Sequence, residues 1–215
     1  MNYVLVCALI ITGLAADPAH AQQMWRIVPK IVVISPTGDS RLPAVDEAVA
    51  FWNRTFTELG SGFRLGAVTS MVRPIPEEAL QQLSASVLGG RGNVASFPPA
   101  LSDLPGDMTI ILAASDFVSF ASPFNQNSRK VVGIKGTSFP PMSFPNVPRN
   151  VIAHEIGHAI GLRHNSDPTM LMCGRPSTCR PGLFRSNEPR MFPLRSDEKV
   201  FVLSMYPSQW KSQSR

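Results

Sequence analysis

The sequence predicts a single α+β domain, and three observations support this fold class. The chain has 215 residues, of which 44% are hydrophobic and 16% charged, which suits one domain with a sizeable core and excludes a disordered chain. Apolar residues recur at helical spacing from 43 to 59. Short apolar runs at 108–113 and 130–135 are typical of strands. We find no internal repeat and no linker between domains.

Each predicted element has its own local signal. Residues 25–34 indicate a strand in which Pro29 favours an edge or a bulge. The helix at 43–59 carries Val45, Val49 and Trp52 on one stripe, and Gly60 follows its end. The remaining predicted elements are strands at 63–72, 108–113 and 130–135, a helix at 76–88, and a last helix from Ser196 to about Tyr206.

The N-terminus resembles an export signal. Val4–Leu14 is an apolar run too short to span a bilayer, and the small-x-small pattern Ala19-His20-Ala21 follows it. We therefore predict a signal peptide at 1–21, which leaves 22–215 as the mature domain. The alternative is a buried N-terminal strand or helix. No later apolar stretch is long enough for a membrane span, so we expect a secreted protein in the periplasm or outside the cell.

The charge of the chain argues against nucleic-acid binding. The formal net charge is +5, but lysine and arginine are scattered and never form a run of three. Nucleic-acid interfaces require a basic cluster with interleaved aromatic residues. We expect a basic, monomeric protein whose surface attracts acidic substrates mildly.

Three histidines after the signal peptide form a pattern typical of metal binding. His154 and His158 are four residues apart, which on a helix places both imidazoles on one face, one turn apart. Gly161 tolerates positive φ, so the chain can turn sharply and return His164 to the other two. Three neutral imidazoles with one open position are typical of a catalytic zinc site. The alternative is a helix with satisfied surface histidines.

Glu155 follows the first histidine directly. It would lie one helical step from the metal-binding face, where a carboxylate can reach water at the open position of the metal. A zinc ion lowers the pKa of its water to about 7, and the carboxylate can accept the proton during attack on a carbonyl. Glu155 is therefore the predicted general base.

The full pattern H-E-x-x-H-x-x-G-x-x-H followed by a methionine resembles the metzincin zinc peptidases, and among them the matrixins most closely. The resemblance implies a metzincin-like zincin domain over 22–215, with a twisted mixed sheet, an active-site helix and a C-terminal helix. It also implies one catalytic zinc ion and protein or peptide substrates. Met172, eight residues after His164, is similar to the Met-turn methionine that forms a hydrophobic floor. Met170 competes for that role, and ordinary core packing is the alternative for both.

The chain departs from the matrixin pattern near this methionine. Asn165 and Cys173 stand where matrixins usually have serine and tyrosine, and neither a cysteine-switch propeptide nor a histidine-bearing structural-zinc loop is present. In an exported protein, Cys173 and Cys179 are expected to form a local disulfide. Two free thiols or a second metal site are the alternatives. In the family, this loop helps to shape the pocket for the substrate side chain after the scissile bond.

The resemblance also implies an edge strand that pairs with an extended peptide substrate. Val131, Val132, Gly133 and Ile134 are the candidates, with an ordinary interior strand as the alternative. We therefore expect a secreted zinc-dependent endopeptidase. The alternatives are a catalytically weak metzincin-like binding module and a zinc hydrolase of a non-peptide amide. The acidic residues are too sparse to indicate a calcium site.

Overall fold

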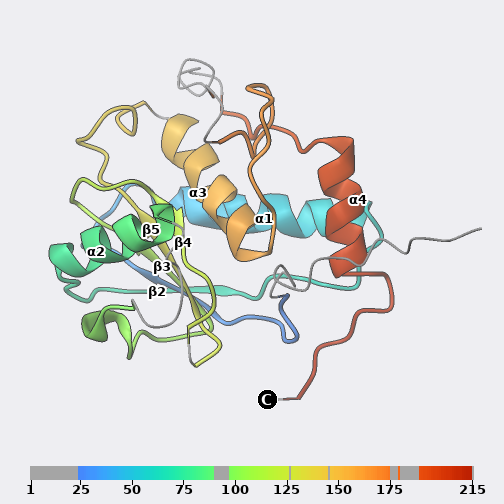
Figure 1. Ribbon diagram of the computed structural model, residues 1–215, viewed down its shortest axis with the longest axis horizontal. Helices are drawn as coiled ribbons and strands as arrows, with labels where there is room; N and C mark the ends of the chain where they lie inside the picture. Colours follow the sequence, from blue (N-terminus) through green and yellow to red (C-terminus); the bar gives the residue numbers. More distant parts are fainter. Residues whose placement is uncertain are drawn as a thin grey trace, which may run out of the picture.

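A computed structural model describes residues 24–89, 97–125, 127–144, 146–174, 179 and 189–214 (Figure 1). The predicted signal peptide at 1–21 lies outside the described residues. No helix in the described part is long and apolar enough to cross a membrane.

The described residues contain one mixed sheet of five strands in the order β2-β1-β3-β5-β4. Strand β1 pairs in parallel with β2 and β3, β3 pairs in parallel with β5, and β4 pairs antiparallel with β5. The strands are β1 (Ile31–Ile34), β2 (Val68–Met71), β3 (Met108–Leu112), β4 (Phe120–Ala121) and β5 (Lys130–Ile134).

Helices cover both faces of this sheet. The α-helices of the described part are α1 (Leu42–Glu58), α2 (Glu77–Leu88), α3 (Asn146–Ala159) and α4 (Ser196–Met205), and a short 3-10 helix, η3, spans Pro99–Leu101. Side chains of a strand alternate between faces, so Val132 belongs to the core beneath α1 and α3, whereas Val131 belongs to a second core with α2. The mixed sheet with its four α-helices is consistent with the metzincin-like fold that the sequence pattern implies.

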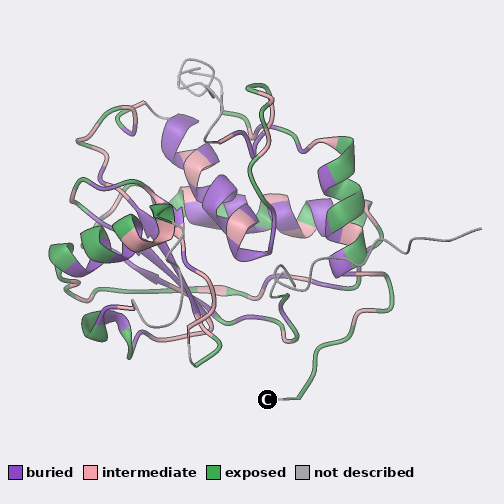
Figure 2. Cartoon of the chain, viewed as in Figure 1, coloured by how far each residue is buried: buried purple, intermediate pink, exposed green. Residues whose placement is uncertain are grey.

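A buried tryptophan joins the two helices that matter most for the site. Trp52 of α1 is fully buried, and its indole Nε1 donates a hydrogen bond to the carbonyl of Ala153 in α3 (2.9 Å). Figure 2 shows buried residues along both helices where they cross and along the strands below them. Burial of such a large ring contributes several kcal/mol in comparable cores. The α1 helix, whose apolar stripe the sequence predicts, therefore holds α3 in place.

The structure corrects the expected edge strand. Val131, Val132, Gly133 and Ile134 lie in β5, which pairs with β3 on one side and β4 on the other. The prediction that they form the edge is wrong, and the interior-strand alternative is confirmed. The edge strands of the described sheet are β2 and β4, and β4, the edge next to β5, has only two residues. Strand β4 could not be predicted from the sequence, because two residues are too few to show an alternation of apolar and polar side chains. The serines and the proline that flank β4 are more typical of loops.

Candidate metal centre

Helix α3 brings the first two histidines together. Their Nε2 atoms are 3.0 Å apart and their ring centroids 4.6 Å apart. The predicted spacing of four residues thus places His154 and His158 on one helix face, as expected from helix geometry. His154 is buried, and His158 is partly buried.

A glycine turn ends α3 and supports the second histidine. Gly161 has φ of +112°, and the Leu162 N–H donates to the Gly157 carbonyl (2.9 Å) while the Gly161 N–H donates to that of His158 (3.0 Å). This is a Schellman-type helix end. The turn also brings the Leu162 carbonyl to within 2.8 Å of the Nδ1 atom of His158. One left-handed residue therefore stops the helix and orients an imidazole.

We expect Gly161→Ala to destabilise the protein by about 2–4 kcal/mol, because alanine resists positive φ and its Cβ would lie 2.9 Å from the Sδ atom of Met205. Urea unfolding measures the loss. Gly60→Ala is the matched control, since Gly60 has φ of +72° but a Cβ added there would meet no atom within 4 Å. Equal losses in the two variants would show that crowding at Gly161 is unimportant.

The third histidine is held by a short bridge between two loops. The N–H of Asn165 donates to the Met172 carbonyl (2.9 Å), and the N–H of Gly174 donates to the Asn165 carbonyl (3.1 Å). The Asn165 side chain also donates to the Glu198 carboxylate of α4 (2.6 Å). These contacts return His164 to the helix, where its ring centroid lies 5.2 and 4.5 Å from those of the other two histidines.

The three histidines form one group that could hold a metal ion. A ring nitrogen from each lies within 4.8 Å of those of the others, and the three range from buried His154 to exposed His164. The Nδ1 atom of His154 lies 2.7 Å from the Leu171 carbonyl. A carbonyl can only accept, so the Nδ1 atoms of His154 and His158 donate, which makes the Nε2 atom of each imidazole the one that can bind a metal. This donor set suits zinc.

The surroundings of His158 lower the pKa of its imidazole. Desolvation, followed by repulsion from His164, lowers the pKa of His158 from 6.5 to about 4. Its imidazole is therefore neutral at physiological pH, the form that binds a metal. Because the folded-state pKa lies below the unfolded value, the resulting stability is present above about pH 6.5 and is lost as the pH falls through about 4.

We expect this shift to appear as an acid dependence of the metal-free protein. Between pH 7 and pH 4, the linkage removes about 3 kcal/mol of unfolding free energy, at 1.36 kcal/mol per pKa unit. Replacing His158 by glutamine should reduce the acid-induced loss by about that amount. Urea unfolding of both proteins with a chelator present at the two pH values measures the difference. An identical loss in both proteins would contradict the assignment.

Glu155 is buried, with 6% of its surface exposed, although it follows His154 on the same helix. It lies outside the group of three nitrogen donors. A carboxylate beside a metal site without being a ligand is placed to exchange protons.

The structure shows where Met172 and the predicted disulfide lie. Met172 is fully buried, and a Cβ at Gly157 would lie 2.5 Å from its Sδ atom, so the thioether packs against α3. Met170, the competing candidate, is partly exposed. The expected disulfide between Cys173 and Cys179 is confirmed, with a Cα–Cα distance of 5.7 Å. Residues 175–178 between them lie outside the described residues.

Asn150, which was not predicted from the sequence to be part of the site, supports the helix that carries the first two histidines. It lies one helical turn before His154 and is fully buried. Its Nδ2 atom donates to the Arg190 carbonyl (2.9 Å), and its Oδ1 atom accepts from the Phe192 N–H (2.8 Å). Asparagine is a poor residue for a helix interior because its amide competes for backbone groups. An asparagine inside the predicted helix was therefore the sequence feature that could have indicated this supporting role.

The segment at 190–193, which Asn150 holds at Arg190 and Phe192, is linked to His154 by hydrogen bonds through Leu171. The carbonyl of Pro193 accepts from the N–H of Leu171 (2.8 Å), and the carbonyl of Leu171 accepts from the Nδ1 atom of His154. Two hydrogen-bonded steps thus connect residues far apart in the sequence to the metal-binding face. Partners of this kind typically change metal affinity 10- to 100-fold when removed.

A glycine after the disulfide-bonded Cys173 was also missed. A Cβ at Gly174 would collide with the imidazole ring of His164, so only glycine allows the backbone to pass this close. The pattern in the sequence that could have revealed it is the pair Cys173-Gly174 directly after Met172.

Comparisons with known proteins do not identify a family for the chain. No family model matches the chain, and no curated protein matches it. Among solved structures, the chain is similar to the crystal structure of an archaemetzincin from Methanopyrus kandleri, with 17% sequence identity and a TM-score of 0.48. The alignment covers 86% of this chain and 96% of that chain. The functional assignment therefore rests on the geometry of the three histidines.

Proposed function

We propose that the protein is a zinc-dependent endopeptidase with a matrixin-like catalytic domain at 22–215, exported after removal of residues 1–21. The convergence of three imidazoles, two of them oriented through their Nδ1 atoms by backbone carbonyls, carries this proposal. His154, His158 and His164 would be the ligands. A zinc ion bound there would supply Lewis-acid chemistry, polarising a peptide carbonyl and making water acidic enough to lose a proton near pH 7.

The protein's own part in the reaction falls mainly to Glu155. Its carboxylate would accept the proton of the attacking water and then deliver it to the nitrogen of the departing amine. Burial excludes bulk water from the carboxylate, so the proton stays with the reacting groups. Met172 would form the apolar floor that keeps α3 and the histidines rigid.

The substrate would lie along β4. This strand pairs with β5 on one side only within the described sheet, so its other edge can pair with an extended peptide. Antiparallel pairing is the commoner geometry, and we adopt it here. The residues before the scissile bond would then lie over the chain that follows Ala121. The loop closed by Cys173 and Cys179 would contact the side chain after the scissile bond.

Two alternatives remain distinguishable. The histidines and Glu155 suit hydrolysis of a carbonyl group in general, so a non-peptide amide is a second substrate class that fits the site. A binding module that had lost turnover would need no buried carboxylate beside the metal site, and the retention of Glu155 favours an enzyme.

The proposal is tested by incubating the refolded, zinc-loaded protein with a mixture of denatured proteins and mapping the new termini. We expect internal cleavage that a chelator abolishes and added zinc restores. Cleavage that persists unchanged with a chelator would contradict zinc-dependent peptidase activity. A zinc-loaded protein that cleaves no protein or peptide would favour the binding module or the non-peptide hydrolase.

A further inference from the structure

Lys130, the first residue of β5, is a buried cation close to the candidate metal centre. Only 5% of its surface is exposed. It shares a strand face with Val132 and Ile134, which pack in the core beneath α3. Its Nζ atom lies over the ring of Phe124, which packs edge-on against Trp25 with 4.8 Å between the ring centroids. The Nε1 atom of Trp25 donates to the carbonyl of Ala159, the residue directly after the second histidine (3.0 Å). The ammonium therefore lies near the site although no part of the proposed mechanism uses it.

The charge of Lys130 is not neutralised by the described part of the chain. Its Nζ atom lies 4.4 Å from the centroid of the Phe124 ring, a cation–π contact. Each ion pair among the described residues involves a different cation. Burial lowers the pKa of Lys130 to about 8, so the ammonium is still charged at pH 7. A buried charge without a counter-ion is unfavourable and acts over a longer distance than a solvated one.

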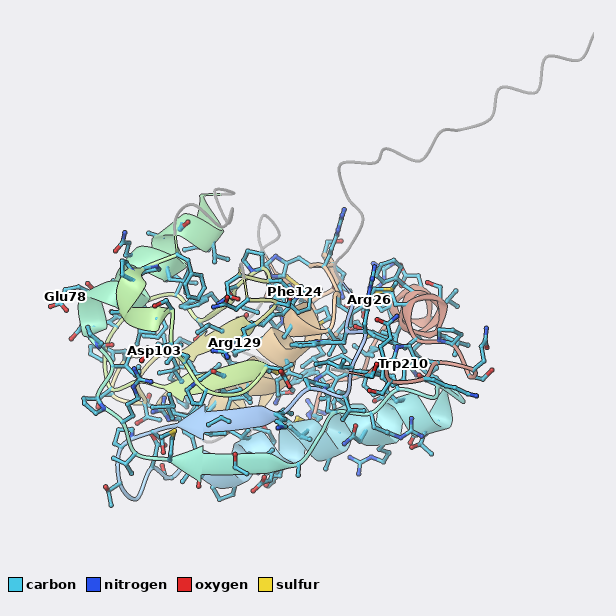
Figure 3. All side chains as sticks on the ribbon, turned by 90° about the horizontal axis from the view of Figure 1, so that it is seen from below. Arg26, Glu78, Asp103, Phe124, Arg129 and Trp210 are labelled. Carbon is cyan, nitrogen blue, oxygen red and sulfur yellow. A yellow bond between two sulfur atoms is a disulfide. The ribbon has the colours of Figure 1, made fainter. Side chains whose placement is uncertain are left out.

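Phe124 places this cation beside the proposed path of the substrate. The ring lies three residues beyond the end of β4, is partly exposed, and packs against the core under α3 (labelled in Figure 3). The Ser122 N–H donates to the Val131 carbonyl (2.8 Å), so the chain after β4 stays beside the start of β5. A peptide paired with the free edge of β4 would continue past this ring.

We propose that Lys130, covered by Phe124, selects substrates with an acidic side chain a few residues before the scissile bond. This inference rests on the proposed peptidase function and on antiparallel pairing with β4. A substrate carboxylate at this position would supply the counter-ion that the described chain lacks. The preferred substrates would be acidic segments of proteins, in keeping with the net charge of +5.

The test uses pairs of fluorogenic peptides that are identical except for glutamate or glutamine at one position, on either side of the scissile bond. We expect kcat/KM to favour glutamate about tenfold at one position before that bond, because the attraction between the two charges acts across the Phe124 ring and needs no direct contact. Lys130→Met, which keeps the apolar stem, should reduce the ratio towards one, and Lys130→Arg should retain it.

Lys135→Met is the matched control. Lys135 directly follows β5, but its Nζ atom is paired with Asp116 (2.7 Å), so the variant should keep the glutamate preference. A wild-type protein that cleaves both members of every pair equally would overturn this inference alone. So would a preference that Lys130→Met leaves unchanged, or one confined to positions after the scissile bond. A wild-type protein that cleaves neither member of any pair would overturn the proposed function, and this inference with it.

Discussion

Glu155→Gln should reduce peptidase activity by about 10²- to 10⁴-fold, the usual contribution of a general acid–base group. Glutamine has nearly the same shape as glutamate, but its amide cannot accept the proton of the attacking water. Because Glu155 lies outside the group of nitrogen donors, zinc binding should persist. The measurement is kcat/KM on one cleaved peptide, together with the zinc content of the purified variant.

The two measurements, kcat/KM and zinc content, distinguish a loss of catalysis from a loss of metal binding. Loss of zinc in the Glu155→Gln variant would show that the carboxylate holds the site together. Activity equal to that of the wild-type protein would remove the proposed mechanism. A variant at Glu58, an exposed acid on α1, is a suitable control, since Glu58→Gln changes the same charge away from the histidines.

Zinc should stabilise the folded protein strongly, because His164 meets the other two histidines of the proposed site only when the chain is folded. At a free concentration 1,000 times its Kd, a ligand that binds only the folded state adds about 4 kcal/mol. For a domain of this size, that free energy raises Tm by roughly 8–16 °C. Thermal unfolding with zinc and with a chelator measures the shift.

Variants assign this shift to the histidines. His154→Ala removes the buried histidine of the proposed site and should abolish most of the zinc-dependent rise in Tm, whereas Glu155→Gln should retain it. Unfolding of His154→Ala in the chelator gives the cost of the substitution itself. If zinc stabilised His154→Ala as much as the wild-type protein, the ion would bind elsewhere and the proposed site would be wrong.

Local patterns were enough to predict α1, α2, α4 and most strands. In α1, the stripe containing Trp52 indicated both the helix and its buried face. In α3, the spacing of His154 and His158 required a shared face, since helix geometry depends on neighbouring residues only. Predicted strand ends were less accurate: the strand expected at 25–34 is limited to Ile31–Ile34, because pairing with β2 and β3 decides where a strand begins.

The sequence by itself therefore determined which groups make up the candidate site: three imidazoles, a carboxylate and a glycine turn at fixed spacing within the segment 154–164. Only the tertiary structure decided what surrounds them. It placed β4 at the sheet edge, positioned Asn150 against the segment at 190–192, and buried Lys130 under Phe124. These features depend on contacts between residues far apart in the chain. No local pattern encodes such contacts, because their partners are chosen by packing and by the need to satisfy buried polar groups.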